Sequence, residues 1–135
     1  MRSLCIAACA ATGLFMSGAL IPASAVADAH ITSVLTTELE GMDGMEANIV
    51  VEKVEPGWET PRHIHPGHVF VYVLEGTIEI AVEGEEPRKV SAGEAVYESP
   101  NKPMIGRNVS SSEGARLVVF QVGPAGEPLM VAQPE

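Results

Sequence analysis

The chain has 135 residues, which is the length of one domain. Its formal net charge is −10 at neutral pH. Nucleic acid and anionic membrane surfaces are therefore excluded as partners, because phosphate binding requires a basic face. Beyond this exclusion, acidity mainly reports solubility and favours no particular activity.

The first 27 residues have the layout of a secretory signal peptide. Arg2 is the only charged residue in this stretch, and a long apolar segment ends in two overlapping Ala-x-Ala patterns. We predict a signal peptide over 1–27, cleaved after Ala25 or Ala27, and a mature domain over 28–135 that is periplasmic or secreted. A transmembrane anchor is the alternative, because the segment has about the length that spans a bilayer. After cleavage, no stable membrane anchor would remain.

Both cysteines, Cys5 and Cys9, fall within the predicted signal peptide. The mature domain would therefore hold neither a thiol nor a disulfide, even in an oxidising compartment. A domain of this size has limited surface to bury. Its stability must then come from its apolar core or from association between copies.

The remaining chain is a series of short apolar runs separated by turn residues. Strands are predicted, in chain order, at 31–37, 47–54, 69–74, 77–82, around Val90, and at 95–97, 104–109 and 116–122, with a last apolar stretch at 129–131. Gly57 and Gly76 lie in turn signals, and no segment keeps a helical period. Many short strands with turns between them predict an all-β sandwich or barrel.

His63 and His65 are the first sign of a functional site. Side chains two residues apart on a strand share one face and are about 6–7 Å apart along the backbone. Two imidazoles placed in this way can bind one metal ion, usually with a further ligand from a neighbouring strand. His-x-His pairs also occur in ordinary strands and loops, so the spacing alone leaves both interpretations open.

The surrounding residues resemble the two motifs of the cupin family. Gly57, five residues, and then His63-Ile64-His65-Pro66-Gly67 before an apolar strand are similar to the first motif, and residues 93–108 are similar to the second. The resemblance covers about residues 47–122. It implies a single-domain, all-β fold, the cupin double-stranded β-helix or jelly-roll barrel, which is expected to form a homodimer. It also implies a small-molecule ligand and a divalent metal such as Mn, Fe, Ni or Cu.

The match is incomplete at the metal ligands that the resemblance implies. The two histidines of the first motif are present, but its glutamate position falls on Val69 and the histidine of the second motif falls on Met104. Asn101 replaces the usual glycine of the second-motif turn, whereas Asn108 matches the terminal asparagine. Both missing ligands are replaced by apolar residues, which argues against a conventional cupin metal site.

Three side chains are candidates to complete a site with His63 and His65. His68 would face the interior only if a β-bulge turned it inward, and on a regular strand it faces out. Glu98 either supplies a carboxylate from an adjoining segment or is a solvated loop residue. Met104 either supplies a thioether, which would suit copper, or fills a gap in the core.

Two aromatic residues are candidate substrate contacts. Trp58 lies near the expected barrel mouth, where it either stacks on a planar ligand or packs in the core. Tyr72 either offers its hydroxyl to a ligand or points into water. The leading hypothesis is an exported small cupin whose His-based pocket holds a metal, a small molecule or both. Its alternative is a non-catalytic ligand- or partner-binding module that has lost its metal. Cupins include both enzymes and binding proteins, so no reaction is assigned.

Overall fold

The computed structural model describes residues 27–134, and strands are the only regular elements in that range. Nearly all of the predicted signal peptide therefore lies outside the described residues. The ten strands are β1 (Ala29–Glu38), β2 (Met45–Val54), β3 (His63–Ile64), β4 (His68–Glu75), β5 (Thr77–Val82), β6 (Arg88–Ser91), β7 (Ala95–Glu98), β8 (Met104–Arg107), β9 (Ala115–Pro124) and β10 (Val131–Ala132). Within this part of the chain, no helix is long and apolar enough to cross a membrane.

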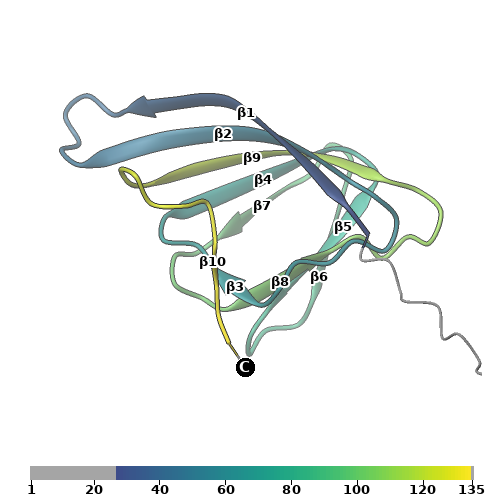
Figure 1. The fold of residues 1–135 in the computed structure, drawn as a ribbon. Helices are drawn as coiled ribbons and strands as arrows, with labels where there is room; N and C mark the ends of the chain where they lie inside the picture. The colour runs from purple at the N-terminus through teal and green to yellow at the C-terminus, as the bar shows by residue number, and fades with distance from the viewer. Residues whose placement is uncertain (1–26, 135) are drawn as a thin grey trace, which may run out of the picture.

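The strands form two five-stranded antiparallel sheets. The first has the order β1-β2-β9-β4-β7 and the second the order β10-β3-β8-β5-β6. Figure 1 shows the first sheet, with its long strands, lying over the second. From β3 to β10 the chain passes repeatedly from one sheet to the other. This is the jelly-roll arrangement that the resemblance to cupins implied, and the predicted all-β, single-domain fold is confirmed.

The strand β4 shows how the apolar pattern forms the core. Val69, Val71 and Val73 are at most 4% exposed and face the space between the sheets. Phe70 and Tyr72 alternate with them and point outward, each 44% exposed. The alternation follows from the two-residue period of a strand, in which successive side chains lie on opposite faces. The interior face of β4 is therefore apolar, and any polar group in the interior comes from other segments.

Two tight turns explain local residue choices. Gly76 joins β4 to β5 with a φ of 76°, and a Cβ there would lie 2.6 Å from the carbonyl oxygen of Gly114. Asn101 lies between β7 and β8 and has a φ of 58°. Apart from glycine, asparagine is one of the few residues that adopt this left-handed conformation readily. This tolerance explains how Asn101 can occupy a turn position where cupins usually have glycine.

The sequence predicted most strands but missed β3. The bounds of β5 are as predicted, and the first two strands are longer than predicted because they form an extended hairpin. β3 has only two residues, too few for an alternating pattern. It exists because His63 and Ile64 pair with β10, and His63 also pairs with Met104 of β8. These long-range pairings bring the histidine segment into the second sheet.

Candidate functional site

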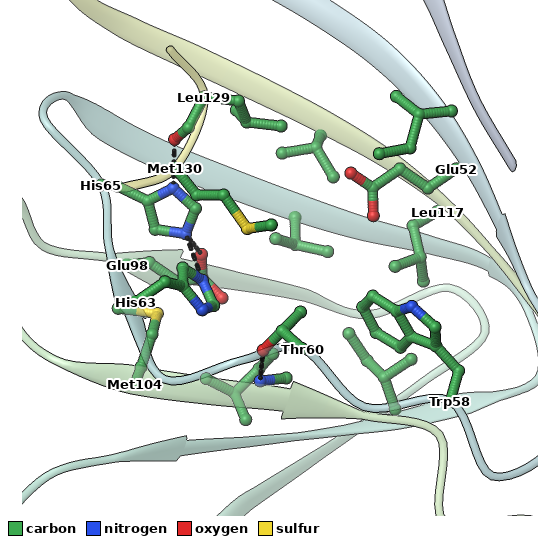
Figure 2. A pocket seen from close by; sticks show the side chains of 16 residues that line it. Glu52, Trp58, Thr60, His63, His65, Glu98, Met104, Leu117, Leu129 and Met130 are labelled. Carbon is green, nitrogen blue, oxygen red and sulfur yellow. Dashed lines mark hydrogen bonds and ion pairs between the residues drawn. The ribbon is translucent and has the colours of Figure 1, made fainter. Parts of the chain in front are cut away.

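A pocket of about 240 Å³ lies between the two sheets (Figure 2). Most of its wall is apolar and includes Trp58, Val71, Ile78, Ile80, Leu117 and Val119. The titratable side chains that line it are Glu52, His63, His65 and Glu98. The pocket is thus a mainly hydrophobic cavity with a few polar groups, which is the usual composition of a small-molecule site.

His63 and His65 meet inside this pocket. They are 4% and 5% exposed, and their Nε2 atoms are 3.2 Å apart. The rings are nearly perpendicular, with an interplanar angle of 87°. The two-residue spacing predicted that both imidazoles share one face and converge, and the structure places them so.

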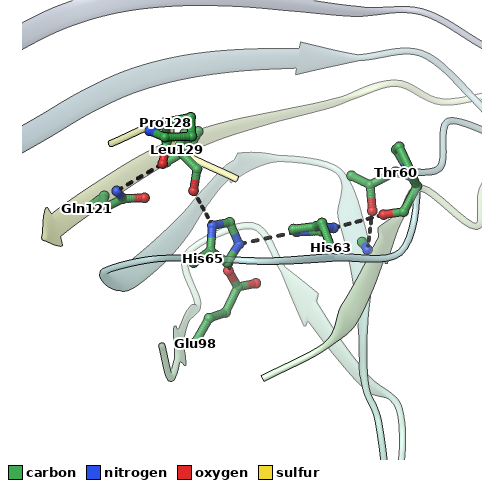
Figure 3. Close-up of polar contacts among 9 residues, drawn as sticks. Thr60, His63, His65, Glu98, Gln121, Pro128 and Leu129 are labelled. Carbon is green, nitrogen blue, oxygen red and sulfur yellow. Dashed lines mark hydrogen bonds and ion pairs between the residues drawn. The ribbon is translucent and has the colours of Figure 1, made fainter. Parts of the chain in front are cut away.

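Backbone carbonyl groups hold both rings in place. Nδ1 of His63 lies 2.9 Å from the oxygen of Pro61, and Nδ1 of His65 lies 2.6 Å from the oxygen of Leu129. A carbonyl only accepts, so each Nδ1 must carry the proton that it donates. In a neutral ring, Nε2 is then the nitrogen with the lone pair. Figure 3 shows the carbonyl oxygen of Leu129, which lies near the C-terminus, directed at the ring of His65.

Glu98 adds a carboxylate to the histidine pair. It is the last residue of β7, is 4% exposed, and its Oε2 lies 3.1 Å from Nε2 of His65. In the register of β4 and β7, Glu98 lies directly opposite Val69. A carboxylate is therefore found one strand away from the position where the resemblance to cupins expects one. We refer to His63, His65 and Glu98 as the His–Glu cluster.

Met104 lies beside this cluster. It pairs with His63 in the second sheet, is 2% exposed and lines the pocket. Figure 2 shows Met104 next to His63 and Met130 above the cluster. The thioether of Met104 is thus close to the imidazoles, and it also packs within the apolar core.

The buried charges perturb one another. Burial lowers the pKa of His63 and is the dominant influence there. Burial also acts to lower the pKa of His65, but the hydrogen bond and the charge of Glu98 outweigh it, so the pKa of His65 is raised. Burial, followed by the charge of Glu98, raises the pKa of Glu52. With no other ligand bound, the cluster favours a proton on His65 that is shared with Glu98.

Two of the predicted site residues lie elsewhere. His68 was expected inside only if a bulge rotated it, but β4 is in regular register with β7 and β9 at this point. Its ring therefore faces outward, and Nδ1 lies 2.6 Å from the hydroxyl of Tyr97. Tyr72 is likewise on the outer face. Both residues are corrected from site candidates to surface residues, whereas Trp58 does line the pocket.

The sequence analysis overlooked Glu52 and the carbonyl of Leu129. Glu52 lies on β2 and is 8% exposed. It shares its face of the strand with its neighbours Val50 and Val54, so it is a glutamate between two inward valines. That pattern was visible in the sequence. The contact of Leu129 with His65 was not, because the two residues are 64 positions apart.

The geometry partly fits a metal ion. Ligand atoms about 2.0–2.2 Å from one ion, at octahedral or tetrahedral angles, lie roughly 2.8–3.6 Å from each other. The measured contacts of His65 with His63 and Glu98 are 3.2 and 3.1 Å. Among residues 27–134, however, no three such side chains already surround one point suited to an ion. Glu98 contacts His65 but not His63, so it would have to rotate to complete a three-ligand site.

Comparisons with known proteins agree with the fold. The family model of the cupin domain matches residues 50–120. A double-stranded β-helix protein from Klebsiella pneumoniae superposes with a TM-score of 0.61 at 20% identity, covering 86% of each chain. The DMSP lyase DddQ from Ruegeria pomeroyi gives 0.60 at 23% identity, covering 78% of this chain and 51% of its own.

An oxalate oxidase in complex with the substrate analogue glycolate gives a TM-score of 0.58 at 23% identity, covering 76% of this chain and 54% of its own. The chain thus spans about half the length of these two enzymes. At this identity the likeness is one of fold. A search of curated proteins found no matching relative.

Proposed function

The chain belongs to the cupin family, and from this premise we propose that its pocket binds a divalent metal ion next to a small-molecule ligand. The ion would be held by His63, His65 and Glu98. The observation that carries the proposal is the convergence of two Nε2 atoms and one carboxylate oxygen at 3.2 and 3.1 Å, with both Nδ1 atoms already bonded to carbonyl groups.

This arrangement needs a positive charge between its members. With each Nδ1 protonated, the two Nε2 lone pairs and the carboxylate are all acceptors, and three acceptors in contact repel one another. Either a proton or a cation relieves the repulsion. Carbonyl groups that fix the second ring nitrogen are a common support of metal-binding histidines. Because the rings are held in advance, an ion would bind without the cost of ordering them.

The ligand set favours a first-row divalent ion. Two imidazoles and one carboxylate suit iron and similar ions that retain open coordination positions. A bound ion would supply a Lewis-acid centre. The neighbouring thioether of Met104 is a soft ligand and keeps copper among the candidates. The side chains themselves would orient a ligand in the apolar cavity. In the absence of an ion, His65 and Glu98 would hold a proton at its edge.

Metal titration tests this proposal. Protein stripped with a chelator is titrated calorimetrically with Mn²⁺, Fe²⁺, Ni²⁺ and copper. We expect at least one ion to bind with a stoichiometry of one per chain. His68→Ala is the control, because His68 lies outside the pocket and its loss should leave the affinity unchanged. Failure of every ion to bind, or an equal loss in His68→Ala, would refute the assigned site.

A metal-free binding module is the second candidate. It is supported by the contact between His65 and Glu98, which satisfies both charges when His65 is protonated, and by the apolar residues Val69 and Met104 at two expected ligand positions. In this case the pocket would bind a small molecule without catalysing a reaction. The same titration separates the candidates, because a module of this kind binds ligand equally well with and without chelator.

Export of the domain is also proposed. The apolar stretch before Asp28 and the confinement of both cysteines to it are the support, and a periplasmic or secreted location would follow. Mass spectrometry of the protein from its native cell should give a first residue of Val26 or Asp28. A soluble protein that retains Met1 would contradict export.

We further propose that two copies associate through the outer face of the first sheet. The rings of Tyr97, Phe70 and Phe120 form a continuous row across β7, β4 and β9, with centroid separations of 5.2 and 6.1 Å. Tyr97 and Phe70 are 48% and 44% exposed. Light scattering should give the mass of a dimer for the wild type and of a monomer for Phe70→Asp. A monomeric wild type would refute this.

A further inference from the structure

The pocket has a second polar group, Glu52, which lies apart from the His–Glu cluster. Figure 2 shows its carboxylate across the cavity from His63, on the same side as Leu117. Its neighbours across the strands are Ile31 of β1 and Leu117 of β9, and both also line the pocket. The carboxylate thus projects from an apolar wall into the cavity.

No side chain of residues 27–134 pairs with this carboxylate. The hydrogen bonds and ion pairs of the pocket join His63, His65 and Glu98 with one another or with carbonyl groups, and Glu52 takes part in none of them. It is nevertheless 92% buried, since only 8% is exposed. Its oxygens are not among the fully buried polar atoms that lack a partner, so they open onto the cavity, where no group in the described part of the protein donates to them. Such a group is satisfied when a ligand brings the missing donor.

The charge of the lining residues restricts what that ligand is. Within the described chain, neither lysine nor arginine lines the pocket, whereas two glutamates do. A carboxylate ligand would meet Glu52 with no lysine or arginine to pair with, and an imidazolium at His65 is already paired with Glu98. An ammonium group would instead form a charge-assisted hydrogen bond with Glu52. Trp58, whose indole also lines the cavity, offers an aromatic face that attracts the same cation.

We propose that Glu52 is a specificity-determining residue that recognises the ammonium group of a mainly apolar amine. The apolar body of the ligand lies along Leu117, Val119 and the isoleucines of β5, and its other end approaches the His–Glu cluster. This assignment rests on the proposed function of the pocket as a small-molecule site, and it specifies the chemical class of the ligand. It sets the chain apart from the glycolate complex of its structural neighbour, since an anion of that kind is disfavoured here.

Three probes of one shape test the ligand class. The mature protein is titrated calorimetrically at pH 7.5 with 2-phenylethylamine, 2-phenylethanol and phenylacetate. We expect the amine to bind at least tenfold more tightly than the alcohol, and the phenylacetate to bind most weakly. Equal affinity for amine and alcohol, tighter binding of phenylacetate, or no binding of any probe at millimolar concentration would overturn the proposal.

A pair of variants tests the residue. Glu52→Gln keeps the shape of the side chain and removes its charge, so the preference for the amine over the alcohol should disappear. Glu55→Gln removes one exposed carboxylate just beyond the end of the same strand and should retain the preference. Both variants are first checked for the cooperative unfolding of the wild type. An undiminished preference in Glu52→Gln would assign recognition elsewhere.

Repeating the titrations with chelator and with Mn²⁺ separates this inference from the proposed metal function. An amine preference that depends on Glu52, found in protein that binds no metal ion, would refute the metal site and leave the present assignment intact. Metal binding without an amine preference would refute the amine assignment and leave the metal site intact. The two proposals therefore fail independently.

Discussion

The two ends of the pocket differ in whether their polar groups already have partners within the protein. At one end, His63 and His65 have both ring nitrogens occupied, by each other, by Glu98 and by carbonyl groups. At the other end, the carboxylate of Glu52 is equally buried but takes part in no such contact. The first end is organised before any ligand arrives, whereas the second is completed by the ligand. Ligand atoms held in fixed positions suit a metal ion, because the ion requires a particular coordination geometry. A single carboxylate without a partner suits a flexible molecule that carries its own hydrogen-bond donor.

The largest expected effect is the loss of metal affinity when one histidine of the His–Glu cluster is removed. In His63→Ala or His65→Ala, one of two nitrogen ligands is lost, and affinity for the best-binding ion should fall by at least about a hundredfold, since loss of a residue that merely supports a ligand already costs up to about that much. Calorimetry on chelator-treated protein measures the change. If either variant bound the ion as tightly as the wild type, the cluster would not be the metal site.

Extending the cluster should strengthen it. Met104 pairs with His63 and lines the pocket, so Met104→His would add a third imidazole. We expect affinity for Ni²⁺ to rise about tenfold, or about 1.4 kcal/mol.

The contrasting change is Val69→Glu. It places a second carboxylate opposite Glu98 in a fully buried position, where like charges disfavour ionisation. It should lower the melting temperature without a comparable gain in Ni²⁺ affinity. A larger gain in Val69→Glu than in Met104→His would show that this register does not describe the site.

The end of the pocket that holds Glu52 should make the stability of the protein depend on pH. The pKa of Glu52 is raised above its ordinary value of 4.5 by burial and then by Glu98. The folded chain therefore binds this proton more tightly than the unfolded chain. The resulting stabilisation is present below pH 4.5 and is lost as the pH rises through the raised pKa.

Glu52→Gln should accordingly be more stable than the wild type at pH 7.5, by on the order of 1 kcal/mol, because the amide carries no charge to desolvate although it remains polar. The difference should shrink toward pH 4. Urea denaturation of metal-free protein at both pH values measures it. A variant less stable than the wild type at pH 7.5 would mean that Glu52 already has a partner.

The smallest effect is expected from the histidine outside the pocket. Among residues 27–134, the polar contact of His68 is with the hydroxyl of the exposed Tyr97. In the monomeric Phe70→Asp background, where no partner copy covers the outer face, His68→Ala should change the free energy of unfolding by no more than about 0.5 kcal/mol, as is usual for surface substitutions. Denaturant titration measures this. A change above about 2 kcal/mol would show that His68 contributes more than a surface contact.

The sequence by itself determined most strands of this fold and one part of the site. Alternation in 69–74 and 77–82 identified buried strands, and the spacing of His63 and His65 placed two imidazoles on one face. These features are local, because the two-residue period of a strand decides which neighbours share a face. The same rule also predicted that His68, on a regular strand, faces away from the pocket.

Only the tertiary structure decided what surrounds the histidines. Glu98 reaches His65 because β7 pairs with β4 opposite Val69, and Leu129 reaches it because β10 pairs with β3. Glu52 enters the same cavity from β2, on the other sheet from β3. These approaches depend on strand order and register, which are set by how two whole sheets bury their apolar faces against each other. A local pattern identifies the face on which a side chain lies, but only the packed sheets determine what lies opposite it.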